Sequence, residues 1–67
     1  MKPSQDTLSY ARLFWNWVWN EGYSYDGSRE RLKAYGLSDT RVQTITRFAE
    51  IMADVWNTER SLLERAG

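Results

Sequence analysis

Residues 39–66 contain neither glycine nor proline, the two residue types that most often end a helix. At a rise of about 1.5 Å per residue, this stretch makes one helix about 40 Å long. Its apolar residues recur at helical spacing and form one stripe: Ile45, Phe48, Ala49, Met52, Val55, Trp56 and Leu63. No part of the chain alternates apolar and polar residues with the period of a β-strand. An all-α fold with a long third helix is therefore predicted.

The first helix is predicted to run to Glu21. Either Ser4 or Asp6 is a suitable capping residue at its start. Gly22 is well placed to end it, because glycine adopts the left-handed backbone conformation that often follows the last turn of a helix.

A shorter second helix is predicted over residues 29–35, after a loop of residues 22–27 that contains an Asp-Gly turn signal. Ser28 is expected to cap this helix and Gly36 to end it. Ser38 is then expected to cap the third helix. Together these signals predict a compact domain of three helices over residues 1–67.

The composition removes several ways of stabilising or using such a small domain. A chain of 67 residues buries only about 60% of its unfolded surface, so its stability is limited. The absence of cysteine excludes disulfides and thiolate metal sites and favours a reducing compartment. Dense aromatic packing and association of two chains remain as stabilising devices, and a helical homodimer is predicted.

Aromatic residues make up half of residues 14–25. On a helical wheel, one face of the first helix carries Leu8, Ala11, Trp15, Val18 and Trp19, with Phe14 at its edge. A second apolar patch, nearly opposite, carries Tyr10, Leu13 and Trp17. A surface helix normally has one apolar stripe little wider than 100°. The first face suits packing against the third helix, and the second patch then needs cover from the second helix or from another chain.

The second helix has little apolar surface to offer, since Arg29, Arg31 and Lys33 leave only Leu32 and Tyr35. Either the tryptophans are all core, or part of them anchors a partner, because Trp and Tyr are enriched at binding hot spots. We predict a non-enzymatic protein that regulates or inhibits a larger protein partner. A phage or mobile-element protein that blocks a larger host protein is one example of the class that we expect. The predicted contact residues are Tyr10, Leu13, Trp17, Tyr23 and Tyr25.

Residues 28–47 support an alternative function. Gly36, Leu37 and Ser38 resemble the turn of a helix-turn-helix, and Val42 and Ile45 match the buried pair of its second helix. The resemblance implies a DNA-binding transcriptional regulator.

The outward residues of that motif are Ser38, Thr40, Gln43, Thr44 and Arg47, which are suited to base edges and phosphates. Residues 28–47 carry five basic and two acidic side chains, a net charge of +3, as phosphate binding favours. Leu32 stands where the motif usually has alanine, and Asp39 at the start of the second helix repels phosphate.

Catalysis is not expected. The chain lacks histidine and cysteine, its acids are scattered over polar helix faces, and it has no glycine-rich phosphate loop. No cofactor, metal or small-molecule substrate is predicted. No apolar run is long enough to span a membrane and no signal-peptide pattern is present, so a soluble cytoplasmic protein is expected. A third possibility is a structural subunit whose aromatic surface serves only self-assembly.

Overall fold

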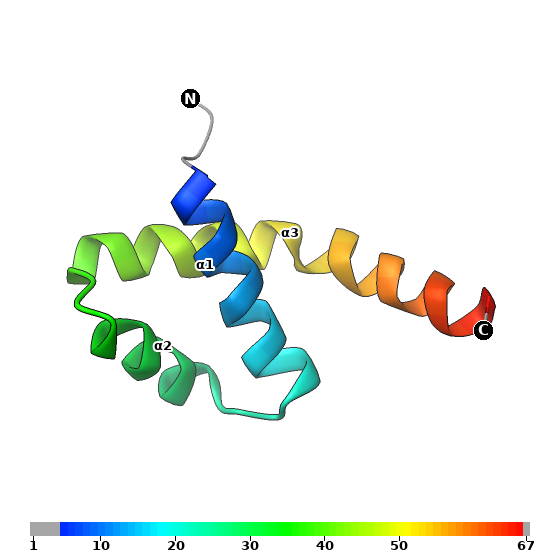
Figure 1. Ribbon diagram of the computed structural model, residues 1–67, viewed down its shortest axis with the longest axis horizontal. Helices are drawn as coiled ribbons and strands as arrows, with labels where there is room; N and C mark the ends of the chain where they lie inside the picture. Colours follow the sequence, from blue (N-terminus) through cyan, green and yellow to red (C-terminus); the bar gives the residue numbers. More distant parts are fainter. Residues whose placement is uncertain (1–4, 67) are drawn as a thin grey trace.

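The structure, a computed structural model, describes residues 5–66 (Figure 1). It contains helix α1 (Gln5–Trp15), a single π-helical segment η1 (Asn16–Asn20), helix α2 (Tyr25–Ala34) and helix α3 (Asp39–Ala66). Residues 5–66 form no strand. The prediction of an all-α domain of three helices with a long third helix is therefore confirmed.

The three helices meet around the first half of α3. In Figure 1, α1 crosses α3, α2 lies below both, and the C-terminal part of α3 extends away from the other helices. Trp56 is the last buried residue of α3 in the described part of the chain. We refer to residues 57–66, beyond Trp56, as the α3 arm. The side chains of residues 61–65 are all exposed.

The core lies where α1 crosses α3. Its fully buried apolar residues come from all three helices: Ala11 and Phe14 from α1, Leu32 from α2, and Val42, Ile45 and Ala49 from α3. Two members of the predicted α3 stripe do not belong to it, because Val55 and Leu63 are exposed. Val55 lies at the edge of the stripe and Leu63 lies on the arm, beyond the reach of α1.

The end of the first helix differs from the prediction of one continuous α-helix to Glu21. After Trp15 the helix widens into η1, where the Glu21 N–H donates to the Asn16 carbonyl at 3.0 Å. Gly22 follows in the left-handed conformation, with φ of 78°, as predicted. At the other end, Asp6 lies in the first turn of α1 rather than at its cap, and Ser4 lies outside the described residues.

The second helix begins four residues earlier than predicted, and its cap is Ser24 rather than Ser28. The Ser24 hydroxyl accepts a hydrogen bond from the Gly27 N–H at 2.9 Å. Asp26 and Gly27, which indicated a turn, lie instead in the first helical turn. A Cβ added at Gly27 would lie 2.8 Å from the Ser24 hydroxyl, so a side chain there would require the Ser24 side chain to shift. Ser28 is fully buried inside α2.

The turn from α2 to α3 agrees with the prediction. Gly36 has a φ of 87°, and its N–H donates to the Lys33 carbonyl at 2.9 Å. The Ser38 hydroxyl accepts a hydrogen bond from the Arg41 N–H at 3.2 Å and caps α3.

Candidate protein-binding cleft

Trp17, expected at the centre of an open aromatic patch, lies in the core with only 3% of its surface exposed. Its ring stacks on Tyr35 of the α2–α3 turn, and the Arg31 guanidinium lies 4.7 Å from the Trp17 ring centroid. The second apolar patch of the first helix was expected to be covered by the second helix or by another chain. In the structure α2 and the residue after it, Tyr35, cover Trp17. From the sequence, the charged Arg31 is not expected to cover apolar surface. A long arginine side chain can nevertheless do so with its aliphatic stem and planar guanidinium group. A direct contact between Trp17 and a partner is therefore not supported.

Of the other predicted contact residues, Tyr10 and Tyr23 share neighbours with Trp17, whereas Leu13 and Tyr25 lie elsewhere. Tyr10 is half-buried beside Tyr35, at 6.1 Å between ring centroids. Tyr23 is exposed and lies under the Arg31 guanidinium. Leu13 is half-buried and faces a different part of the molecule, between α1 and the α3 arm.

Tyr25 belongs to a third location. Its ring packs edge-on against Phe14 at 5.1 Å between centroids, and its hydroxyl donates a hydrogen bond to Glu50 of α3. Burial and the hydrogen bond to the Glu50 carboxylate raise the pKa of Tyr25 above its usual value of 10.0. These contacts give Tyr25 a structural role that joins the start of α2 to α3.

An open cleft of about 500 Å³ lies between α1–η1 and the α3 arm. Its first wall contains Arg12, Leu13, Trp15 and Asn20. Its second wall contains Trp56, Glu59, Arg60 and Leu63.

Two tryptophans form the floor of the cleft. Trp15 and Trp56 pack edge to face, with 5.9 Å between ring centroids. The Trp15 ring nitrogen donates a hydrogen bond to the Asn57 side-chain oxygen at 3.1 Å. The Arg12 guanidinium lies 4.9 Å from the centroid of each tryptophan ring. These contacts hold the floor in one conformation.

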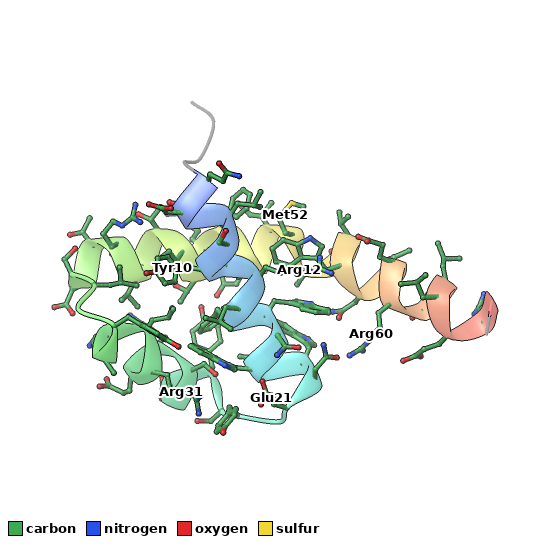
Figure 2. All side chains as sticks on the ribbon, in the orientation of Figure 1. Tyr10, Arg12, Glu21, Arg31, Met52 and Arg60 are labelled. Atoms are coloured by element: carbon green, nitrogen blue, oxygen red, sulfur yellow. The ribbon has the colours of Figure 1, made fainter. Side chains whose placement is uncertain are left out.

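Arg60 joins the arm to η1 at the same cleft. One of its terminal nitrogens donates to the Trp19 carbonyl at 3.2 Å and to the Asn20 side-chain oxygen. Its Nε is buried and has no hydrogen-bond partner. Figure 2 shows Arg12 extending from α1 towards α3, and Arg60 extending from α3 towards η1.

Asn20 is itself held by other side chains of η1. Its amide donates to the Asn16 oxygen at 2.9 Å, and the Asn16 amide donates to Glu21 at 2.8 Å. This chain of hydrogen bonds orients the acceptor for Arg60 and so helps to fix the angle between η1 and the arm.

The cleft carries a net positive charge. Arg12 and Arg60 contribute two cations and Glu59 one carboxylate. Within residues 5–66, neither arginine forms an ion pair. The sequence analysis missed this site. Its signal was present as two arginines placed one helical turn from tryptophans, Arg12 before Trp15 and Arg60 after Trp56.

The predicted DNA-contacting residues lie together on the first turns of α3. Ser38, Thr40, Gln43, Thr44 and Arg47 are exposed, while Val42 and Ile45 are buried. This distribution agrees with the pattern expected of a recognition helix.

Only some of the basic side chains of residues 28–47 gather on that surface. Arg29 lines a shallow hollow together with Gln43 and Arg47. Arg31 instead packs against Trp17 and Tyr23, and Lys33 pairs with Glu30 at 3.5 Å and with Asp39 at 3.4 Å.

Residues 5–66 contain no cluster of three or more His, Cys, Asp or Glu side chains arranged to hold a metal ion. None of their helices is both long and apolar enough to cross a membrane.

Comparisons with known proteins do not place the chain in a family. No protein-family model matches it, and neither the curated proteins nor the solved structures contain a significant match.

Proposed function

We propose that this chain is a non-enzymatic binding protein that regulates or inhibits a larger protein, and that it binds through the cleft between α1–η1 and the α3 arm. The observation that carries the proposal is the presentation of exposed Arg12 and Leu63, with half-buried Leu13, on the two walls of one cleft. Trp15 and Trp56 are core residues that support these walls from beneath, with 4% and 6% of their surface exposed. Of the contact residues predicted from the sequence, Leu13 lines this surface.

The composition of the cleft favours a protein partner. Tryptophan and arginine are enriched at the energetic centres of protein interfaces. Leu63 stands on the wall formed by the arm, and residues 5–66 leave 71% of its surface exposed. A partner side chain placed between Leu13 and Leu63 would bury apolar surface on both walls. Burial of apolar surface is the main driving force for association.

We also propose that a second copy of the chain binds the outer side of α3. Ile51, Val55 and Leu62 recur there at helical spacing and are 67%, 53% and 60% exposed. We call these three residues the outer stripe. It lies on a different side of α3 from the cleft residues Trp56 and Leu63. A two-fold dimer with two antiparallel α3 helices would bury both outer stripes and leave both clefts open.

DNA binding is the second candidate function, supported by the joint exposure of Thr40, Gln43, Thr44 and Arg47. It is weakened because Arg31 and Lys33 are engaged away from that surface, and phosphate contacts supply most of the affinity of a DNA-binding protein. Lys33 in particular lies between two carboxylates.

Site-specific photo-crosslinking in cells that express the protein distinguishes these proposals. A benzophenone amino acid is placed at Leu63 in the cleft, at Leu62 in the outer stripe, or at Gln43 on the candidate DNA surface. Leu62 and Leu63 are adjacent and both exposed, so each serves as the matched control for the other.

A heterologous protein attached at Leu63 but not at Leu62 is the expected result. An adduct with twice the mass of the chain is expected at Leu62. If Leu63 gives no heterologous adduct, or if both positions give the same adducts, the proposed cleft function is wrong. Adducts with DNA at Gln43 would favour the second candidate.

A further inference from the structure

We infer that the cleft recognises an acidic amphipathic helix, with a partner carboxylate near Arg12 and Arg60 and an apolar partner side chain between Leu13 and Leu63. This inference rests on the function proposed above, and it specifies the chemistry of the partner segment.

The charges of the cleft favour a partner segment that carries an acidic side chain. Arg12 is exposed, and its guanidinium contacts only the faces of Trp15 and Trp56 among the described residues. The hydrogen-bond acceptors of Arg60 are neutral oxygens of Trp19 and Asn20. Glu59 lines the cleft and Glu21 is hydrogen-bonded to Asn16 at its edge, but no acidic side chain of the described residues forms an ion pair with Arg12 or Arg60. A partner carboxylate would pair with one of these arginines, and charge-assisted hydrogen bonds to arginine are about twice as strong as neutral ones.

The walls of the cleft favour a helix over an extended strand. Both walls are helical, so their backbone groups are already paired within α1, η1 and α3 and present no free edge for a strand. A helix satisfies its own backbone groups and can pack between two diverging helices through side chains alone.

The spacing of the partner residues follows from helix geometry. Residues three or four positions apart lie on the same face of a helix, about 5–6 Å apart. The apolar anchor and the acid are therefore expected at i and i+3 or i+4. The anchor would contact Leu13, Leu63 and the tryptophan floor, and the acid would lie beside Arg12.

The test is a selection from a displayed library of helical peptides against the purified full chain. Positions on one peptide face are randomised among apolar, acidic, basic and neutral polar residues. The same selection is repeated on Arg12→Glu, which reverses the charge in the cleft. Arg65→Glu makes the same change on the arm at a residue that does not line the cleft. Arg12→Gln serves as a milder variant, and the helicity of every variant is checked first.

The wild-type chain should enrich peptides with an apolar residue followed by Asp or Glu at i+3 or i+4. Arg12→Glu should replace the acidic preference with a basic one, and Arg65→Glu should leave it unchanged. For one selected peptide, Arg12→Gln should weaken binding about tenfold, the effect of losing one charge-assisted contact.

Two other outcomes overturn the inference and are distinguishable. In the first outcome, the selected peptides lose binding to Leu63→Asp, and so bind the cleft, but show no preference for acidic residues. This result would disprove the acidic partner and leave the proposed function standing. If no enriched peptide depends on Leu63, both the inference and the proposed function are wrong.

Discussion

The indole ring of Trp17 stacks on the ring of Tyr35, with 6.3 Å between centroids and only 8° between the planes. Trp17 belongs to η1, and Tyr35 follows the last residue of α2. The stack therefore links η1 to the C-terminal end of α2. It also gives a surplus aromatic side chain a place in the core of a domain that has no disulfide.

Replacing Trp17 by alanine should destabilise the fold strongly. Truncation of a buried tryptophan costs about 3–5 kcal/mol, which approaches the whole stability of a domain this small. Trp19→Ala is the matched control, since Trp19 is 37% exposed and lies on the same segment. Urea denaturation followed by circular dichroism should show Trp17→Ala mostly unfolded in buffer and Trp19→Ala close to wild type. A stable Trp17→Ala chain would mean that Trp17 is not a core residue.

Arg31 should stabilise the domain by covering aromatic rings rather than by pairing with an acid. Its guanidinium lies 4.7 Å from the Trp17 ring centroid and 4.5 Å from that of Tyr23. Arg31→Ala is expected to lower the free energy of unfolding by about 1 kcal/mol, the usual size of a partly exposed cation–π contact. Tryptophan fluorescence should shift to longer wavelength as Trp17 becomes hydrated.

The variant Arg31→Met separates the two contributions of this arginine. It keeps an unbranched apolar stem over Trp17 and removes the charge. Its fluorescence should remain near that of the wild type while part of the stability is lost. Equal effects of Arg31→Ala and Arg31→Met would show that covering the ring contributes nothing.

The two serines at the start of α2 should respond in opposite ways to substitution. Ser24→Ala removes the cap of α2 and is expected to destabilise the domain by about 1 kcal/mol. Ser28→Ala removes a fully buried hydroxyl that has no hydrogen-bond partner, so its effect should be neutral or stabilising. Thermal denaturation of both variants provides the comparison. If Ser28→Ala lost more stability than Ser24→Ala, the assignment of Ser24 as the cap of α2 would be wrong.

Tyr25 should lose its proton at higher pH than an unperturbed tyrosine. Burial and the hydrogen bond to Glu50 raise its pKa above 10.0. Just above pH 10.0, Tyr25 of the unfolded chain releases its phenolic proton, while Tyr25 of the folded chain retains it. The stabilisation associated with neutral Tyr25 is therefore complete below pH 10.0 and is lost as the pH rises through the folded-state pKa.

A pH titration of tyrosinate absorbance measures this effect. Tyr25→Phe should remove a high-pH component from the curve, and Glu50→Gln should move that component to lower pH. Tyr23→Phe should leave it in place. A titration curve unaffected by Glu50→Gln would exclude the hydrogen bond as a cause.

Local signals in the sequence were sufficient for the helices with clear ends. Gly22, Gly36 and Ser38 occupy the positions that their backbone and capping chemistry predicted. The predicted start of α2 was wrong because Ser24 and Ser28 are the same residue type and are equally good helix caps when judged from the sequence. The choice was made by tertiary packing, which buries Ser28 between helices and leaves Ser24 at the surface.

The candidate site was harder to predict than the fold, because it depends on how the helices cross. A helical wheel of the first helix placed Trp19 on the face towards α3 and Trp17 away from it. In the structure Trp17 is buried, whereas 37% of the surface of Trp19 is exposed. The wheel assumes a regular α-helix with one neighbour, whereas the chain widens into η1 and receives α2 on its second side.

The sequence by itself determined the type, number and order of the helices, since these follow from apolar periodicity, caps and glycines within short stretches of the chain. Only the tertiary structure decided which aromatic side chains are core and which line the cleft. That division depends on the crossing of α1 and α3, and on the side chains of Arg31 and Tyr35 over Trp17. Burial is a property of contacts between segments far apart in the chain, and no local pattern contains it.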